Sequence, residues 1–285
     1  MPVLSTDLRI PATDSYSLAA TSFLPAGTPR GALIVNSAMA VRRGYYADFA
    51  RAAATQGWAV LTYDYRGIGD SRPTRLRGFA ARATDWMALD FEGVLAWARR
   101  EWRPARAVVV GHSFGGNALG LAPAAATLDA VAMVAAQNGY WRLWPAPRRQ
   151  QLGLLWHTVA PIVPRVWGYM PRWAGLGGEV PAGVVLQWAG WCRQPRYALD
   201  DRSHDASGYA RLAAPLRLIS LADDADFAPR AAVQALAELY PAARAEHLPL
   251  RPRDHGLTRI GHFGFFRPQA QALWPLALDA LAPRE

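Results

Sequence analysis

Five short apolar runs, separated by segments with helical patterns, constrain the fold of this chain more than any other feature. The runs are ALIVN (32–36), AVLTYD (59–64), AVVVG (107–111), AVAMVAA (130–136) and LRLISL (216–221). Each has the length of a buried strand and is bounded by turn residues or charges. Helices are expected at about 45–56, 84–101, 114–126, 229–239 and 267–281. Strands that alternate with helices predict an α/β fold with a mostly parallel central sheet, flanked by helices on both faces.

Two segments depart from this alternation. Residues 7–24 alternate apolar and polar positions, which predicts an antiparallel hairpin at the edge of the sheet. From Tyr140 to about Asp205 no strand pattern is visible, and prolines are expected to limit helices to short pieces. Seven of the twelve tryptophans lie there, at 141, 144, 156, 167, 173, 188 and 191. We predict a helical, Trp-rich cap at 140–206, inserted between the two parts of the α/β core, 1–139 and 207–285.

Composition excludes several chemistries. All 31 basic residues are Arg, so there is no Walker A lysine, no Schiff-base lysine and no Ser-Lys dyad. The net charge is +9, but the basic residues are spread along the chain, and no nucleic-acid partner is expected. A single cysteine, Cys192, allows no internal disulfide and no zinc-finger spacing. We interpret it as a buried thiol. No metal or organic cofactor is indicated.

The compartment is predicted from the same sequence. The start MPVLSTDLRIP lacks a secretory signal pattern, and no apolar run approaches about 20 residues. We therefore expect a cytoplasmic protein. The stretch LLWHTVAPIVPRVWGYM is rich in Trp and Arg and offers a peripheral membrane contact as an alternative. A lid buried against the core is the preferred interpretation of that stretch.

The segment VVVGHSFGG (108–116) places Ser113 between an apolar run and a predicted helix. A nucleophile on such a strand-to-helix turn adopts a strained backbone, so its neighbours must be small. The turn lifts the hydroxyl above the sheet edge, and the next amide, that of Phe114, points at a developing oxyanion. The alternative is a serine that only caps a helix among packing glycines. The strand before and the helix after favour the catalytic interpretation.

A serine nucleophile needs a base and an acid, which are expected later in the chain. LRLISLADDADFAP is a strand followed by carboxylates, of which Asp224 is preferred, with Asp223 and Asp226 as rivals. GHFGFF places His262 before the last predicted helix, where a loop would cover the carboxyl edge of the sheet. The other histidines are given other places: His112 in the elbow, His157 and His204 in or beside the cap, His247 in the last strand and His255 in a loop.

The loop after ALIVN is expected to provide a second oxyanion donor. The amide of Ala38 is the first choice and that of Met39 the second. The segment DYRGIGDS (64–71) is interpreted as a structural turn, in which Arg66 and Asp70 pair locally.

GHSFGG, DYRGIGDS, the late ADD and GHFGFF together resemble the α/β-hydrolase superfamily over nearly the whole chain. The nearest likeness is to bacterial hydrolases described as serine-aminopeptidase-like or lysophospholipase-like, to which PAGVVLQWAGWCRQPRY is also similar. The resemblance implies a Ser-His-Asp triad under a helical cap, with Ser113, His262 and Asp224 at the matching positions. Asn36-Ser37 stands where the family usually has His-Gly.

These observations predict a serine hydrolase that cleaves a carboxylic ester through an acyl-enzyme. Candidate substrate contacts are Met39 and the cap residues Trp141, Trp144, Trp156 and Trp188, unless these tryptophans only form the core of the cap itself. Residues 141–206 carry eight Arg against one Glu and three Asp, so a hydrophobic uncharged or anionic ester is favoured over a substrate with a free ammonium group. The alternatives are an acyltransferase on the same fold, an aminopeptidase or amidase, and a non-catalytic binding protein.

Overall fold

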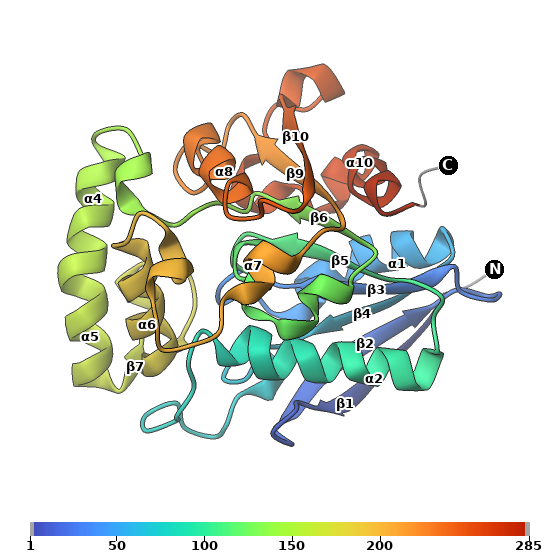
Figure 1. The fold of residues 1–285 in the computed structure, drawn as a ribbon, viewed down its shortest axis with the longest axis horizontal. Helices are drawn as coiled ribbons and strands as arrows, with labels where there is room; N and C mark the ends of the chain where they lie inside the picture. The colour runs from blue at the N-terminus through green and yellow to red at the C-terminus, as the bar shows by residue number, and fades with distance from the viewer. Residues whose placement is uncertain (1–2, 283–285) are drawn as a thin grey trace.

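The computed structural model describes residues 3–282 and is built on one large mixed sheet (Figure 1). Its eight strands follow the order β1-β2-β4-β3-β5-β6-β9-β10. They span Leu4–Pro11 (β1), Ser17–Leu24 (β2), Gly31–Asn36 (β3), Trp58–Tyr63 (β4), Ala107–His112 (β5), Ala130–Val134 (β6), Pro215–Leu221 (β9) and Arg244–Leu250 (β10). Strands β3, β4, β5, β6, β9 and β10 are parallel, whereas β1 and β2 pair antiparallel at one edge. The predicted α/β architecture and the edge hairpin are confirmed.

Helices cover both faces of the sheet. Helix α2 lies in front of it in the view of Figure 1, and α1 and α10 lie behind it. The helices span Ala47–Thr55 (α1), Glu92–Trp102 (α2), Phe114–Asn117 (α3), Arg148–Leu154 (α4), Ala160–Trp167 (α5), Ala182–Cys192 (α6), Ser207–Arg211 (α7), Arg230–Ala237 (α8), Gly261–Gly264 (α9) and Trp274–Leu278 (α10). None of the helices within residues 3–282 is both long enough and apolar enough to span a bilayer. Strands β3, β4, β5 and β6 are fully buried, which explains why their sequences are continuous apolar runs.

The helix predicted at 114–126 is broken, so that prediction was wrong in length. Helix α3 stops at Asn117, and two 3-10 turns follow at 119–121 and 123–127. A Cβ on Gly120 would lie 2.3 Å from the ring of Tyr209. The chain is thus packed against an aromatic ring from α7, and Pro123 opens the next turn. Gly120 and Tyr209 are some 90 positions apart in sequence, so a local pattern could not predict this contact.

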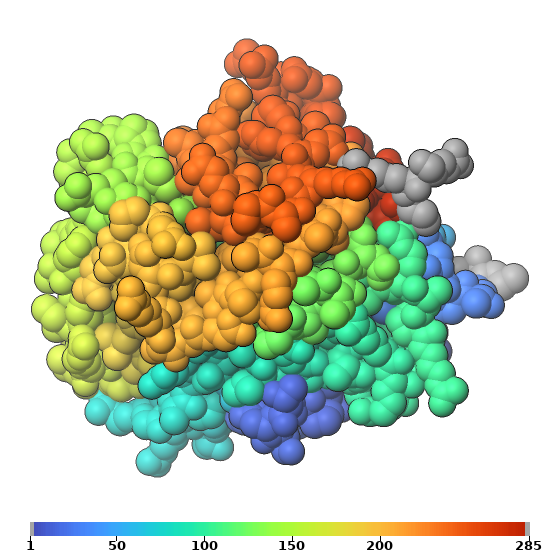
Figure 2. All heavy atoms as spheres, in the orientation of Figure 1, coloured from blue at the N-terminus to red at the C-terminus, as the bar shows by residue number. Residues whose placement is uncertain are grey.

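The Trp-rich segment forms a separate group of helices beside the sheet. Figure 2 shows it as the yellow-green and gold part of the surface, against the orange C-terminal part. Helices α4 and α5 join through a π turn at 155–159 into one helical run from 148 to 167, which contains Pro161 and Pro164. The expectation of short pieces was therefore wrong for this run. Pro161 is tolerated because it lies in the first turn after the π turn, where the regular hydrogen-bond pattern is already shifted.

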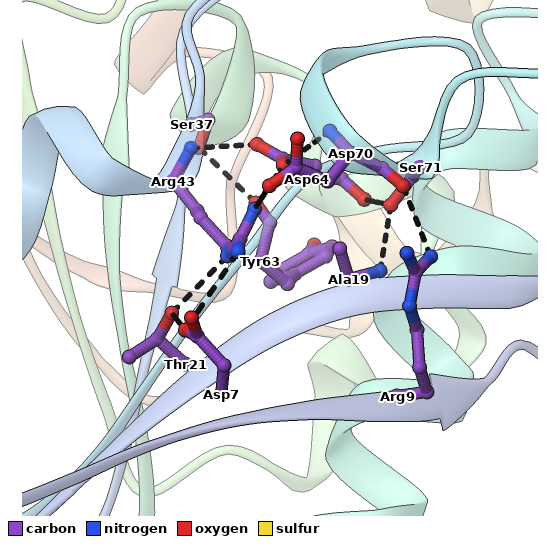
Figure 3. A network of polar contacts seen from close by, with 10 residues as sticks. All are labelled: Asp7, Arg9, Ala19, Thr21, Ser37, Arg43, Tyr63, Asp64, Asp70 and Ser71. Carbon is purple, nitrogen blue, oxygen red and sulfur yellow. Dashed lines mark hydrogen bonds and ion pairs between the residues drawn. The ribbon is translucent and has the colours of Figure 1, made fainter.

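Figure 3 shows the polar network that ties the turn at 64–71 to the loop after β3. The fully buried carboxylate of Asp64 accepts hydrogen bonds from the Arg43 backbone and guanidinium, both at 2.7 Å. Arg43 also pairs with Asp70. Gly69 has a φ of +52°, and a Cβ on it would lie 2.3 Å from Asp64 Oδ2, so this position requires glycine.

The predicted pairing of Arg66 with Asp70 is wrong. Arg66 instead bonds Asp90 through Nε at 2.7 Å and Asp14 through both terminal nitrogens. Because Asp90 precedes α2 and Asp14 lies between β1 and β2, the ion pairs join three elements that are distant in sequence. The side chains of Arg66 and Asp70 thus each pair with residues outside the turn.

Candidate active site

Ser113 lies at the sharp turn between β5 and α3. Its backbone has φ 50° and ψ −116°, a conformation that costs a non-glycine residue about 1–3 kcal/mol. Two glycines make the turn possible. A Cβ on Gly111 would lie 2.5 Å from Gly116 Cα, and one on Gly115 would lie 2.3 Å from the Asn36 carbonyl oxygen. The structure therefore places Ser113 at a tight turn between a strand and a helix, as predicted.

Three of the predicted site residues meet at this turn. The hydroxyl oxygen of Ser113 lies 2.9 Å from His262 Nε2, and His262 Nδ1 lies 2.6 Å from Asp224 Oδ2. All three residues are more than nine-tenths buried. Burial raises the pKa of Asp224, while the hydrogen bond from His262 opposes that shift. This arrangement lets Nδ1–H donate to the carboxylate and leaves Nε2 free to accept the serine proton.

The three candidate aspartates make different contacts in the structure. Of these three aspartates, only Asp224 has a hydrogen bond or ion pair with His262 in the described part of the chain. Asp223 Oδ2 instead accepts the backbone N–H groups of Ile260 and Gly261, at 2.8 and 3.0 Å, and so holds the loop that carries His262. Asp226 uses its backbone carbonyl, which accepts hydrogen bonds from Trp144 and Arg148.

The remaining histidines lie elsewhere. His247 is in β10, as predicted, and bonds Ser220 Oγ at 2.8 Å. His255 ends a 3-10 turn, and His157 lies in the π turn of the cap. His204 follows the cap helices and lies 3.3 Å from Asp201.

His112 lies beneath the nucleophile and joins two loops. The Ala38 N–H donates to the Tyr46 hydroxyl at 2.9 Å, and that hydroxyl lies 2.9 Å from His112 Nδ1. On its other side, His112 Nε2 lies 2.9 Å from the carbonyl oxygen of His262. Because a carbonyl only accepts, Nε2 carries the proton, and the Tyr46 hydroxyl donates to Nδ1. One chain of hydrogen bonds thus runs from the loop after β3 to the backbone of His262.

We expect His112 to make the free energy of unfolding depend on pH. Burial lowers the pKa of His112 well below 6.5, and the neighbouring His262 adds to the shift. As the pH falls below about 6.5, the unfolded chain binds a proton that the folded chain does not, so the free energy of unfolding falls. Between pH 7 and 5.5 the loss is about 1 kcal/mol for this group. Urea unfolding of the wild type and of His112→Asn at both pH values checks this; an equal pH dependence in the two proteins would refute it.

The two predicted oxyanion donors differ in their contacts. Phe114 is the first residue of α3, and its N–H donates no hydrogen bond within residues 3–282. The Ala38 N–H, the first choice for the second donor, is engaged by Tyr46. The Met39 N–H, the second choice, has no hydrogen-bond partner among the described residues. The structure therefore favours Met39 over Ala38 as the available amide.

An apolar cavity lies next to residues that contact the rings of His262 and Phe114. Its volume is about 70 Å³, and it is bounded by Phe227 and Trp188. Phe227 stacks on the His262 ring with centroids 4.8 Å apart, and Trp188 contacts Phe114 edge-on at 6.1 Å. Trp144 and Trp156 also line the cavity, as does Cys192, a buried thiol.

Two predicted substrate contacts lie outside the lining of this cavity. Trp141 packs against His157 at 5.4 Å, and Met39 lies in the loop after β3 and is nine-tenths buried. Among residues 3–282, no three His, Cys, Asp or Glu side chains cluster as a metal site would require.

The comparisons with known proteins agree with this geometry. A sequence-family model described as serine aminopeptidase, S33, matches residues 27–180, which is more than half of the chain. The chain belongs to this family. It is thus a serine hydrolase of the α/β-hydrolase type, and the resemblance noted in the sequence is confirmed. No curated protein matches the chain by sequence.

Solved structures share the fold over nearly the whole chain. DcsB, solved in complex with its substrate analogue, has a TM-score of 0.63 at 17% identity and covers 98% of each chain. The esterase Pf2001 of Pyrococcus furiosus has a TM-score of 0.61 at 13% identity, covering 98% of this chain and 92% of its own. The esterase domain of a Rhodothermus marinus protein has a TM-score of 0.59 at 17% identity, covering 98% of this chain and 100% of its own. At these identities the likeness shows the fold.

Sequence reasoning missed Tyr46, Phe227 and the role of Asp223. Tyr46 and Phe227 are aromatic residues in segments whose local patterns predict only a helix start and a loop. Their contacts with His112 and His262 come from distant parts of the chain. For Asp223, the only local signal was its place beside Asp224.

Proposed function

We propose that this family member is a carboxylic ester hydrolase that works through Ser113, His262 and Asp224. The observation that carries the proposal is the continuous hydrogen-bonded line from the strained serine through the imidazole to the buried carboxylate. A serine hydroxyl is a weak nucleophile until such a base takes its proton. The same arrangement serves acyl transfer on several unrelated folds.

In the proposed mechanism, Ser113 Oγ attacks the ester carbonyl while His262 Nε2 takes its proton. His262 then gives this proton to the leaving alcohol, and an acyl-enzyme remains. A water molecule, deprotonated by the same imidazole, attacks the acyl group and releases the acid. Asp224 holds the ring in the required tautomer and stabilises the imidazolium.

The amides of Phe114 and Met39 are proposed to bind the oxyanion, with each donor contributing about 3 kcal/mol to transition-state stabilisation. In this scheme Ala38 acts indirectly, because its bond to Tyr46 fixes the loop from which the Met39 amide projects. The ion pairs of Arg43 anchor the far end of the same loop.

Tyr46→Phe tests this assignment. Removing the hydroxyl leaves the Ala38 amide and His112 Nδ1 without their partner and loosens the loop, so we expect kcat to fall about tenfold with little change in KM. If Ala38 were the oxyanion donor, the variant would free that amide and kcat would rise. Steady-state kinetics with an aryl ester distinguish the two results.

The cavity supports a short, uncharged acyl group as substrate. Its volume of about 70 Å³ is far below the roughly 300–1,000 Å³ of pockets that enclose drug-sized ligands. The single carboxylate in its lining, Asp226, is exposed and lies beside Arg148. A free ammonium group would therefore find no buried counter-charge there, which disfavours aminopeptidase activity for this chain.

The experiment compares three substrate groups. We expect acetyl to butyryl nitrophenyl esters to be hydrolysed faster than octanoyl or longer esters, and faster than aminoacyl amides. Preference for the amides would overturn the ester assignment. An acyltransferase is the second candidate, and product analysis with thioester donors and added alcohols separates acyl transfer to an acceptor from hydrolysis.

Three further predictions await their tests. The cap at 140–206 is proposed to cover the site, since its tryptophans line the apolar cavity next to Phe227, whose ring stacks on His262. Contact of the cap with a membrane surface stays a prediction, for which liposome sedimentation is the measurement. Location in the cytoplasm likewise stays a prediction.

A further inference from the structure

Gln137 lies at the carboxyl edge of the sheet, the edge that also bears Ser113 and Asp224. It follows β6, the strand between β5, which leads to Ser113, and β9, which leads to Asp224. Backbone bonds fix this edge: Ser113 N–H donates to the Val134 carbonyl, and Ala135 N–H donates to the Ile219 carbonyl, both at 2.9 Å. The segment that bears Gln137 is thus held in place on both sides.

The side-chain oxygen of Gln137 is buried and has no hydrogen-bond partner among the described residues. The residue as a whole is 7% exposed. The neighbouring Asn138 shows the contrast, because its amide donates to the Pro195 carbonyl and accepts from the Tyr140 N–H. Most buried polar side-chain atoms in proteins have a partner, so an exception calls for an explanation.

Gln137 is also one of the residues that line the apolar cavity next to Phe227, whose ring stacks on His262. The apolar part of the lining consists mainly of Trp144, Leu152, Leu155, Trp156, Leu176 and Trp188. An apolar side chain at 137 would suit these walls better than an unpaired amide does. The terminal torsion of Gln is broad and roughly two-fold, so either its oxygen or its nitrogen can face the cavity.

We propose that Gln137 recognises a hydroxyl group on a short acyl chain, so that the preferred substrates are esters of short 2- or 3-hydroxy acids. This inference rests on the proposed esterase function. A hydroxyl both donates and accepts, and it therefore satisfies the amide in either orientation. It is also small and neutral, as a cavity of about 70 Å³ without a buried counter-charge requires.

The test measures a ratio of kcat/KM values by pH-stat. Ethyl butyrate is compared with ethyl 2-hydroxybutyrate and ethyl 3-hydroxybutyrate, using the wild type, Gln137→Met and Gln187→Met. Gln187, in α6, is the matched control, because its amide already bonds Thr84 of the core and Asp201 of the cap. We expect the wild type and Gln187→Met to prefer one hydroxy ester about tenfold or more. In Gln137→Met the ratio should fall to near one.

A ratio near one in the wild type, or a preference that survives Gln137→Met, would overturn the inference. Changes that affect all three esters equally do not alter the ratio. A second arm needs no turnover: NMR titrations measure binding of the same esters to Ser113→Ala and to Ser113→Ala/Gln137→Met. Tighter binding of a hydroxy ester that depends on Gln137 supports the inference even if the esterase assignment fails, and equal binding refutes it.

Discussion

Ser113→Ala is expected to lower kcat for ester hydrolysis by about 10⁴- to 10⁶-fold, because it removes the atom that forms the acyl-enzyme. The loss should fall on kcat much more than on KM, since the cavity and the oxyanion amides stay in place. Removal of one hydroxyl that points out of the sheet should leave the fold intact, which thermal unfolding checks. The measurement is steady-state hydrolysis of a nitrophenyl ester.

Ser220→Ala is the matched control for this variant. Ser220 is also buried and also contacts a histidine, with its hydroxyl 2.8 Å from His247 Nε2. It lies within β9, however, and not at a strand-to-helix turn. We expect Ser220→Ala to keep nearly full activity. Turnover that persists in Ser113→Ala, or that disappears in Ser220→Ala, would contradict the assignment of the nucleophile.

Asp224→Asn is expected to lower kcat by about 10⁴-fold. The amide keeps the size of the side chain but can donate a hydrogen bond to Nδ1, which favours the wrong ring tautomer and leaves the imidazolium without its counter-charge. Because the carboxylate is buried and lies 2.6 Å from the ring, solvent cannot replace it. Kinetics over a range of pH values measure the loss.

Two neighbouring variants serve as controls. Asp226→Asn should have little effect on kcat, because the contacts of Asp226 are made by its backbone. Asp223→Asn should have an intermediate effect, because it weakens the anchoring of the 260–262 loop without touching the ring. An Asp226 variant as impaired as Asp224→Asn would show that the acid has been assigned to the wrong residue.

The sheet could be predicted from the sequence because its inner strands are buried on both faces. Continuous apolar runs such as AVVVG and ALIVN are typical of parallel strands that helices cover on both faces. Helix lengths were predicted less well where contacts from distant residues decide them. The Tyr209 ring packs against Gly120, just beyond the end of α3 at Asn117, and the π turn at 155–159 directly precedes the helix turn that contains Pro161.

The site was predictable where its residues have a fixed order in the chain. Ser113 follows a strand and precedes a helix, and His262 comes last, so both could be named from local patterns and order alone. The choice among Asp223, Asp224 and Asp226 needed coordinates, because a shift of one residue decides which carboxylate faces the ring. The bond between Ala38 and Tyr46 is a loop contact of the same kind, and no sequence pattern signals it.

Mapping the site of a fluorophosphonate adduct by peptide mass spectrometry tests the central claim most directly. The reagent phosphonylates a serine whose proton is taken by a neighbouring base and does not react with an ordinary serine. We predict a single adduct on the peptide that contains Ser113, and its absence in both Ser113→Ala and His262→Ala. An adduct on Ser220, or a wild-type protein that remains unlabelled at Ser113, would contradict the account.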